Sequence, residues 1–203
     1  MHLVIFDLET TGFSPRYHEI IQIAAIRMRH GQIVAADRFE TFVRPQNAIP
    51  DEITELTGIT DSDVSDAPEP AEALQALSRF VSDATLVAHN GRRFDLPFVR
   101  ECCRRHQLPL REVPVIDSIT FSRRIWANER SHNLDAVMER LGLSAKGLRR
   151  HDARGDVGIL AEAVRCMWQR LGTPPDRSPV PLDVGHLPKL KPVRTGIENV
   201  ACT

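Results

Sequence analysis

Hydrophobic and polar positions in the first 43 residues predict three consecutive strands. Residues 2–8 contain the unbroken apolar run Leu3–Phe6, which is typical of a buried strand. The segment 19–28 is rich in Ile and Ala and predicts a second strand, and residues 33–43 predict a third after the break at 30–31. Short breaks between successive strands favour an antiparallel meander.

The pattern changes after this meander. Residues 45–68 are irregular, with recurring Pro, Asp, Thr and Gly and a short helix expected over 51–56. From residue 70 onward, helical and strand-like apolar patterns alternate. The expected elements are a helix over 70–82, a strand over 85–88, a helix over 97–106, a strand over 113–116, and helices over 134–141 and 156–171. Such alternation implies parallel pairing through crossovers, so we expect a mixed sheet flanked by helices.

The composition shifts at residue 173. Residues 173–203 hold six of the 14 prolines and lack Phe, Trp and Tyr. We therefore expect one domain over 1–172 and a loosely ordered, Pro-rich C-terminal tail over 173–203. The pattern leaves open whether this tail docks in extended form on the domain or on a partner.

Composition excludes several classes of protein. Lys and Arg number 26 against 27 Asp and Glu, so the net charge of -1 excludes a broadly basic protein of the histone type but allows a local basic face. Four cysteines, two of them adjacent, do not make a disulfide framework. The chain shows no signal peptide and no apolar window of about 18 residues, so we expect a cytoplasmic protein without membrane contact.

Carboxylates at the end of the first strand are the first candidates for chemistry. Asp7 and Glu9 lie two residues apart, so their side chains point to the same face of the strand. Two carboxylates on one face repel unless a cation lies between them, and Mg²⁺ and Mn²⁺ prefer oxygen ligands. The alternative is a solvated strand end.

Two further segments carry polar residues at the ends of elements. Asp95 precedes Pro97 at an expected helix start, where it serves either as an N-cap or as a metal ligand. His151 lies before the last long helix and Asp156 within it. Both can face one site only if His151 lies on a loop or in the first turn, and Asp152 is a competing ligand. Taken together, the carboxylates favour a site for two cations, with a nearby histidine as general base.

Three segments contain these candidate residues: Phe6–Gly12 (Phe-Asp-Leu-Glu-Thr-Thr-Gly), Ala88–Asp95 (Ala-His-Asn-x-x-x-Phe-Asp) and His151–Asp156 (His-x-x-x-x-Asp). They resemble the exonuclease motifs of the DEDDh family, also called DnaQ-like 3′–5′ exonucleases. Their order and spacing match the family, which includes the proofreading epsilon subunit of bacterial DNA polymerase III. The resemblance covers about residues 2–171.

This resemblance implies a ribonuclease H-like α/β fold with a five-stranded mixed sheet and helices on both faces. It implies hydrolysis from a 3′ end, release of nucleoside 5′-monophosphates, and two Mg²⁺ or Mn²⁺ ions. The implied metal ligands are Asp7, Glu9, Asp95 and Asp156, with Asp7 bridging the ions. His151 would be the general base that takes a proton from the attacking water.

The implied substrate contacts surround these ligands. The residues expected to bind substrate are Thr10 and Thr11, Glu52 at the 3′ hydroxyl, His89 and Asn90 beside the carboxylates, and Arg92 and Arg93 in a basic rim. Phe94 and Phe98 are expected in the core. Two positions depart from the family: Gln22 stands where many members carry Glu, and Thr57 precedes Gly58 where polymerase-associated members often place His.

Single-stranded DNA is the first expected substrate and RNA the second, since related members trim RNA. A non-catalytic nucleic-acid-binding or polymerase-associated module is the remote alternative, against which the complete set of carboxylates argues. Because no polymerase domain is visible in the chain, a proofreading role would need a polymerase or a repair complex as partner.

Overall fold

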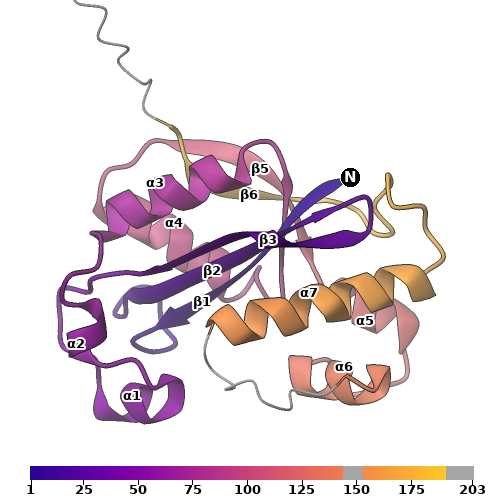
Figure 1. Ribbon diagram of the computed structural model, residues 1–203, viewed down its shortest axis with the longest axis horizontal. Coiled ribbons are helices and arrows are strands. Elements are labelled where there is room, and N and C mark those ends of the chain that lie inside the picture. Colours follow the sequence, from indigo (N-terminus) through magenta and orange to yellow (C-terminus); the bar gives the residue numbers. More distant parts are fainter. Residues whose placement is uncertain (144–152, 191–203) are drawn as a thin grey trace, which may run out of the picture.

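A computed structural model describes residues 1–143 and 153–190, apart from the side chains of Ala153, Arg154 and Asp156. One mixed sheet runs through the molecule, with helices on both of its faces (Figure 1). The strands are β1 (His2–Thr10), β2 (Ile20–Arg29), β3 (Gln32–Phe42), β4 (Thr85–Ala88), β5 (Leu110–Asp117) and β6 (Asp183–Pro188). The helices are α1 (Asp51–Thr57), α2 (Asp61–Val64), α3 (Pro70–Val81), α4 (Asp95–Arg105), α5 (Ile119–Ile125), α6 (Leu134–Leu141) and α7 (Ala153–Arg170).

The strand order β3-β2-β1-β4-β5-β6 combines a meander with crossovers. β1, β2 and β3 pair antiparallel, whereas β4 pairs parallel with both β1 and β5. This confirms the expected mixed sheet. The parallel strands end at the same edge of the sheet, so β1, β4 and β5 bring Glu9, Ala88 and Asp117 to one side of the molecule.

The expectation of five strands is wrong, because the Pro-rich segment supplies a sixth. β6 pairs antiparallel with the edge strand β5, from Leu110↔Pro188 to Val115↔Asp183. Ser78 on α3 also donates a hydrogen bond to the carbonyl oxygen of Pro188 (2.7 Å). Prolines are tolerated at the ends of edge strands, where a missing N–H costs no ladder bond. The division into a domain over 1–172 and a tail over 173–203 stays a prediction, but part of that tail belongs to the sheet.

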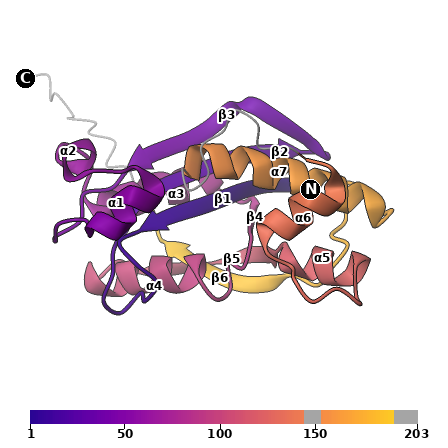
Figure 2. The same cartoon turned by 90° about the horizontal axis from the view of Figure 1, so that it is seen from below.

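Alternation along β1 builds the two layers around the sheet (Figure 2). Val4, Phe6 and Leu8 pack on the side covered by α3 and α4. Leu3 and Ile5 pack on the opposite side with apolar residues of α7. Because side chains alternate along a strand, Asp7 continues the row of Leu3 and Ile5 and points to the side of α7.

Two short helices close one end of the sheet. α1 and α2 lie together beyond the meander (Figure 1), where Ile53 of α1 and Val64 of α2 form a small apolar cluster with Ile21 of β2. α1 ends at Gly58, whose φ of 75° gives the left-handed cap that commonly terminates a helix. α1 confirms the helix expected over 51–56. It lies near the end of β1 that carries the candidate site.

Several other expectations are tested by the fold. Phe98 is 2% exposed and Phe94 packs against the same cluster, which confirms that both are core residues. The three cysteines in the described ranges, Cys102, Cys103 and Cys166, are free thiols. In the same ranges, no helix has the length and apolar character that crossing a bilayer requires.

Candidate active site

The end of β1 presents the first two candidate ligands. Asp7 and Glu9 lie opposite Ala24 and Gln22 of β2, and the register shifts between Glu9 and Thr10. Such a bulge re-aims the side chains at the end of a strand and is common beside active sites. Gln22 is buried (2% exposed) and lies opposite Glu9. Its neutral side chain adds no negative charge at a position where a carboxylate would.

Residues 89–94 form a tight loop between β4 and α4 that brings Asp95 to the same edge. Asn90 has a φ of 63°, a left-handed conformation that Asn adopts at lower cost than most residues. Gly91 is required by close packing, because an added Cβ would lie 2.5 Å from the Cβ of Ala88. The backbone N–H groups of Arg93 and Phe94 then donate to the carbonyl oxygen of Asn90 (3.0 and 3.1 Å), which turns the chain into α4.

Asp117, at the end of β5, holds this loop in place. Its Oδ1 accepts hydrogen bonds from the backbone N–H of Asn90 (3.0 Å) and of Ile119 (3.1 Å). Its Oδ2 accepts a longer hydrogen bond from the backbone N–H of Arg92 (3.3 Å). Ser118 adds a contact of 2.8 Å between its hydroxyl and Nδ1 of His89. The end of β5 therefore orients the segment that carries His89, Asn90 and Asp95.

Asp95 is a buried carboxyl group whose pKa is shifted upward. It is the first residue of α4 and is 2% exposed. Burial raises the pKa of Asp95 well above its ordinary value, and the negative charge of Asp7 raises it further, with smaller contributions from Asp117 and Glu9. The charges of Asp7, Glu9 and Asp117 therefore all act on Asp95 from the same edge of the sheet.

Asp95 has the properties expected of a metal ligand. Its Oδ1 is buried and has no hydrogen-bond partner among the described residues. A buried carboxylate oxygen beside other carboxylates is stabilised by a cation, so the side chains of Asp7, Glu9 and Asp95 fit the implied metal site. Among the described residues alone, no group of three or more His, Cys, Asp or Glu side chains makes up a complete metal site. The fourth implied ligand is Asp156, whose side chain is not among those that the structure describes.

The last motif is described in part. The backbone of Asp156 lies in the first turn of α7, and α7 packs along β1 and β2. Figure 1 shows that first turn pointing toward the end of β1. His151 and the competing candidate Asp152 lie outside the described residues, so their roles stay predictions.

Thr10 and Thr11 shape the turn that follows β1. The hydroxyl of Thr10 donates to the carbonyl oxygen of Gly12 (2.6 Å), and that of Thr11 accepts from the backbone N–H of Glu19 (2.9 Å). Gly12 packs against the ring of His18, which an added Cβ would approach to 2.3 Å. Both threonines are buried, at 6% and 7% exposed, so any contact with a terminal nucleotide stays a prediction.

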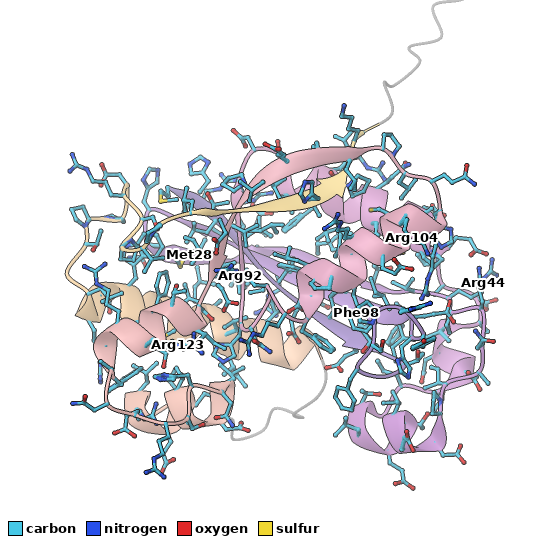
Figure 3. All side chains as sticks on the ribbon, turned by 180° about the vertical axis from the view of Figure 1, so that it is seen from behind. Met28, Arg44, Arg92, Phe98, Arg104 and Arg123 are labelled. Atoms are coloured by element: carbon cyan, nitrogen blue, oxygen red, sulfur yellow. The ribbon has the colours of Figure 1, made fainter. Side chains whose placement is uncertain are left out.

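The other expected substrate residues lie on separate elements. Glu52 is exposed in the first turn of α1. Arg92 and Arg93 are exposed on the loop before α4, and Arg92 forms an ion pair of 3.3 Å with Asp183 of β6. Figure 3 shows Arg92 in front of the sheet on the side of α4. Thr57, the second departure from the family, is buried, and its hydroxyl donates to the carbonyl oxygen of Ile53 (2.8 Å).

Asp117 is the residue that the sequence reasoning missed. The strand expected over 113–116 stopped one residue before it, whereas β5 includes it. A signal was present, because Asp117 follows the apolar run Val115–Ile116 just as Asp7 follows Leu3–Phe6. The rule that located Asp7, a carboxylate at the end of a buried strand, would have located Asp117 also.

We expect Asp117→Asn to lower the free energy of unfolding by about 1–3 kcal/mol, because an amide cannot accept hydrogen bonds on both sides. The relief of repulsion on Asp95 acts in the opposite direction but is smaller, because burial and the charge of Asp7 raise the pKa of Asp95 more than Asp117 does. Urea unfolding at pH 7 measures the change. Asp83→Asn, at an exposed turn before β4, is the matched control and should change nothing. Equal stability of the two variants would contradict the assigned role.

Comparisons with known proteins agree with this geometry. The sequence pattern of the RNase_T family, described as Exonuclease, matches residues 4–164. A DNA polymerase III subunit epsilon-like protein of Rhodobacter capsulatus is 40% identical over 164 residues, which are 79% of this chain and 23% of that protein. The PolC-type DNA polymerase III of Streptococcus pneumoniae serotype 2 is 39% identical over 141 residues, which are 70% of this chain and 9% of that protein. The chain thus spans less than a quarter of either relative.

Solved structures share the fold. The nuclease domain of 3'hExo, a DEDDh family member bound to rAMP, superposes with a TM-score of 0.73 at 20% identity, covering 90% of this chain and 96% of that one. Exonuclease X in complex with 5′ overhanging duplex DNA gives a TM-score of 0.68 at 24% identity, covering 86% and 95%. The expected ribonuclease H-like α/β fold is confirmed.

Proposed function

We propose that this chain, which belongs to the DEDDh (DnaQ-like) exonuclease family, is a metal-dependent 3′–5′ exonuclease. Single-stranded DNA is its first candidate substrate. The chemistry is hydrolysis of the terminal phosphodiester. Water adds to phosphorus, the bond between phosphorus and the 3′ oxygen of the penultimate nucleotide breaks, and a nucleoside 5′-monophosphate leaves. The shortened strand keeps a free 3′ hydroxyl.

The observation that carries this proposal is the environment of Asp95. A carboxyl group that is 2% exposed, faces the charge of Asp7 and has one oxygen without a described hydrogen-bond partner is unfavourable in an isolated protein. Such an arrangement is typical of a site whose charges are balanced by a ligand. The ligand with the right chemistry is a divalent cation that prefers oxygen donors.

Asp7, Glu9, Asp95 and Asp156 would hold two Mg²⁺ or Mn²⁺ ions. When bound, such ions withdraw charge from the phosphate and lower the pKa of the attacking water. His151 would accept the proton of that water. Asp117 keeps the loop before Asp95 in position through its hydrogen bonds to Asn90 and Arg92.

The surface beside the site has groups suited to a nucleic acid. The turn after β1 carries Phe13 and Tyr17, which are 80% and 72% exposed. Exposed aromatic rings stack on bases regardless of sequence, and nearby guanidinium groups attract phosphates. These residues support a single strand as substrate.

RNA is the second candidate. One structural relative is an exonuclease that recognises a histone mRNA stem-loop, and another is bound to rAMP, whereas Exonuclease I and Exonuclease X are solved with DNA. A protein distinguishes the two nucleic acids by contacts to the 2′ hydroxyl.

We expect nucleotide release from a 20-nucleotide DNA strand in Mg²⁺ or Mn²⁺, slower release from the RNA of the same sequence, and none in excess chelator. Ca²⁺ should bind without supporting turnover, because it prefers more ligands at longer distances. Chromatography of the products identifies nucleoside 5′-monophosphates, and a 3′-phosphorylated strand controls for polarity. Full activity in chelator would rule out the metal site, and faster cleavage of RNA would make RNA the substrate.

A further inference from the structure

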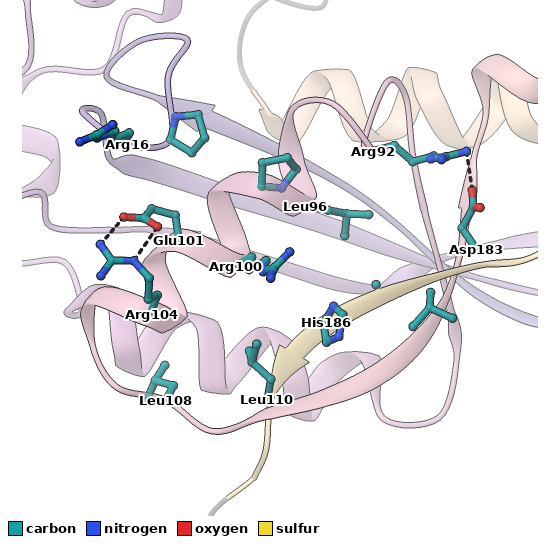
Figure 4. Close-up of a pocket in the computed structure, with 14 residues that line it drawn as sticks. Arg16, Arg92, Leu96, Arg100, Glu101, Arg104, Leu108, Leu110, Asp183 and His186 are labelled. Atoms are coloured by element: carbon teal, nitrogen blue, oxygen red, sulfur yellow. Dashed lines mark hydrogen bonds and ion pairs between the residues drawn. The ribbon is translucent and has the colours of Figure 1, made fainter.

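A groove of about 1050 Å³ lies on the outer side of α4, away from the face of the sheet that Asp7 occupies. β6 forms its opposite wall, so the groove exists because the Pro-rich segment adds a sixth strand (Figure 4). Leu96, Leu108 and Leu110 form apolar parts of its lining, and four arginines stand around it. The arginines are Arg16, Arg92, Arg100 and Arg104.

The charge of this groove is positive although the chain as a whole carries -1. Two acidic residues, Glu101 and Asp183, also line it. Each already pairs with an arginine, Arg104–Glu101 at 2.7 Å and Arg92–Asp183 at 3.3 Å. Arg16 and Arg100 are exposed and form no ion pair with a described residue. Two guanidinium groups are therefore available to an external anion.

The positions of the arginines suggest an elongated anion. Leu96, Arg100 and Arg104 are four residues apart and lie on one side of α4. From Leu96 to Arg104 the helix rises about 12 Å. Figure 4 shows Arg16 and Arg92 toward opposite ends of the groove, with Arg100 between them. Phosphates of one strand are spaced at about 3.4 Å along the axis of a stacked helix and further apart in an extended strand, so this length spans at most about three or four nucleotides.

Chain continuity connects the groove to the candidate active site. Leu96 follows Asp95 directly, and Arg92 lies on the loop that Asp117 holds. At the other end, Arg16 belongs to the turn that follows β1. We propose that this groove binds the sugar-phosphate backbone of the substrate strand several nucleotides upstream of its 3′ end. The proposal rests on the proposed exonuclease function and names a second binding region for the same substrate.

The test compares long and short substrates. In Arg16→Ala/Arg100→Ala, the KM for a 20-nucleotide strand should rise about tenfold, as expected for two lost phosphate contacts, with little change in kcat. The p-nitrophenyl ester of thymidine 5′-monophosphate, which has no upstream nucleotides, should keep its KM. The slope of log(kcat/KM) against log salt for the long strand should become shallower by about 1.4, or about 0.7 for each phosphate.

Arg79→Ala/Arg177→Ala is the control, because both residues are exposed, lie outside the groove and remove the same charge. An equal rise in KM for both double variants, or an unchanged KM in the groove variant, overturns the proposal. Fluorescence anisotropy of the labelled 20-nucleotide strand without metal gives an independent readout of binding. Weaker binding by the groove variant when the unmutated protein releases no nucleotide would support the groove and contradict the exonuclease function.

Discussion

Asp95→Asn should abolish cleavage and, at the same time, stabilise the metal-free protein. Loss of a metal ligand removes several kcal/mol of transition-state stabilisation, so the single-turnover rate should fall at least about 10³-fold. The amide keeps the size of the carboxyl group at the start of α4 but cannot ionise. It therefore removes the repulsion from Asp7 that contributes to the raised pKa of Asp95.

The sign of the pH dependence follows from the direction of this shift. Because the pKa of Asp95 is higher in the folded protein than in the unfolded chain, the folded protein holds this proton more tightly. The contribution of Asp95 to stability is complete below about pH 4 and is lost as the pH rises through the raised pKa. In Asp95→Asn this loss should disappear, so the melting temperature in chelator at pH 7 should exceed that of the unmutated protein.

Asp83→Asn removes an exposed carboxylate from the turn before β4 and serves as the control, with unchanged activity and stability. Asp7→Ala should also abolish cleavage and leave the stability of the metal-free protein equal or higher, since it removes the charge that acts most strongly on Asp95. A large loss of stability with residual activity in Asp95→Asn would mean that Asp95 supports the start of α4 rather than the chemistry.

The sequence predicts the parts of this fold that depend on local patterns. Long apolar runs located β1, β2 and β3, and the alternation after residue 70 located the parallel strands. Helix α5 was missed because Ile119–Ile125 spans fewer than two full turns and no side chain caps its start.

Non-local pairing explains the other differences. Asp183–Pro188 contains one proline, at its last position, but nothing within it requires a strand. Its order comes from hydrogen bonds to β5 and from Ser78. The Pro-rich composition therefore predicted a loosely ordered tail, whereas in the folded protein the segment pairs with the edge strand β5. Likewise, the pattern placed Asp7, Glu9 and Asp95 at the ends of elements, but the burial of Asp95 and its support by Asp117 arise only when β1, β4 and β5 assemble.

His151→Ala should lower the maximal rate about 10²–10⁴-fold, the usual contribution of a positioned general base. His151 lies outside the described residues, so this expectation rests on its spacing from Asp156 and on the family motif. The water that attacks phosphorus must lose a proton, and neutral imidazole accepts it. Because His151 is not among the implied metal ligands, the affinities for metal and DNA should remain nearly unchanged.

The rate of the unmutated protein should rise with pH through an inflection near the ordinary histidine pKa of about 6.5, because only the neutral imidazole accepts a proton. In His151→Ala this inflection should vanish. Single-turnover release of nucleoside 5′-monophosphate, measured across the histidine range, tests both expectations. His2→Ala is the control, since His2 is exposed at the start of β1, the opposite end from Asp7. If His151→Ala retains both rate and inflection, another group accepts the proton, and Asp152→Asn then tests the neighbouring carboxylate.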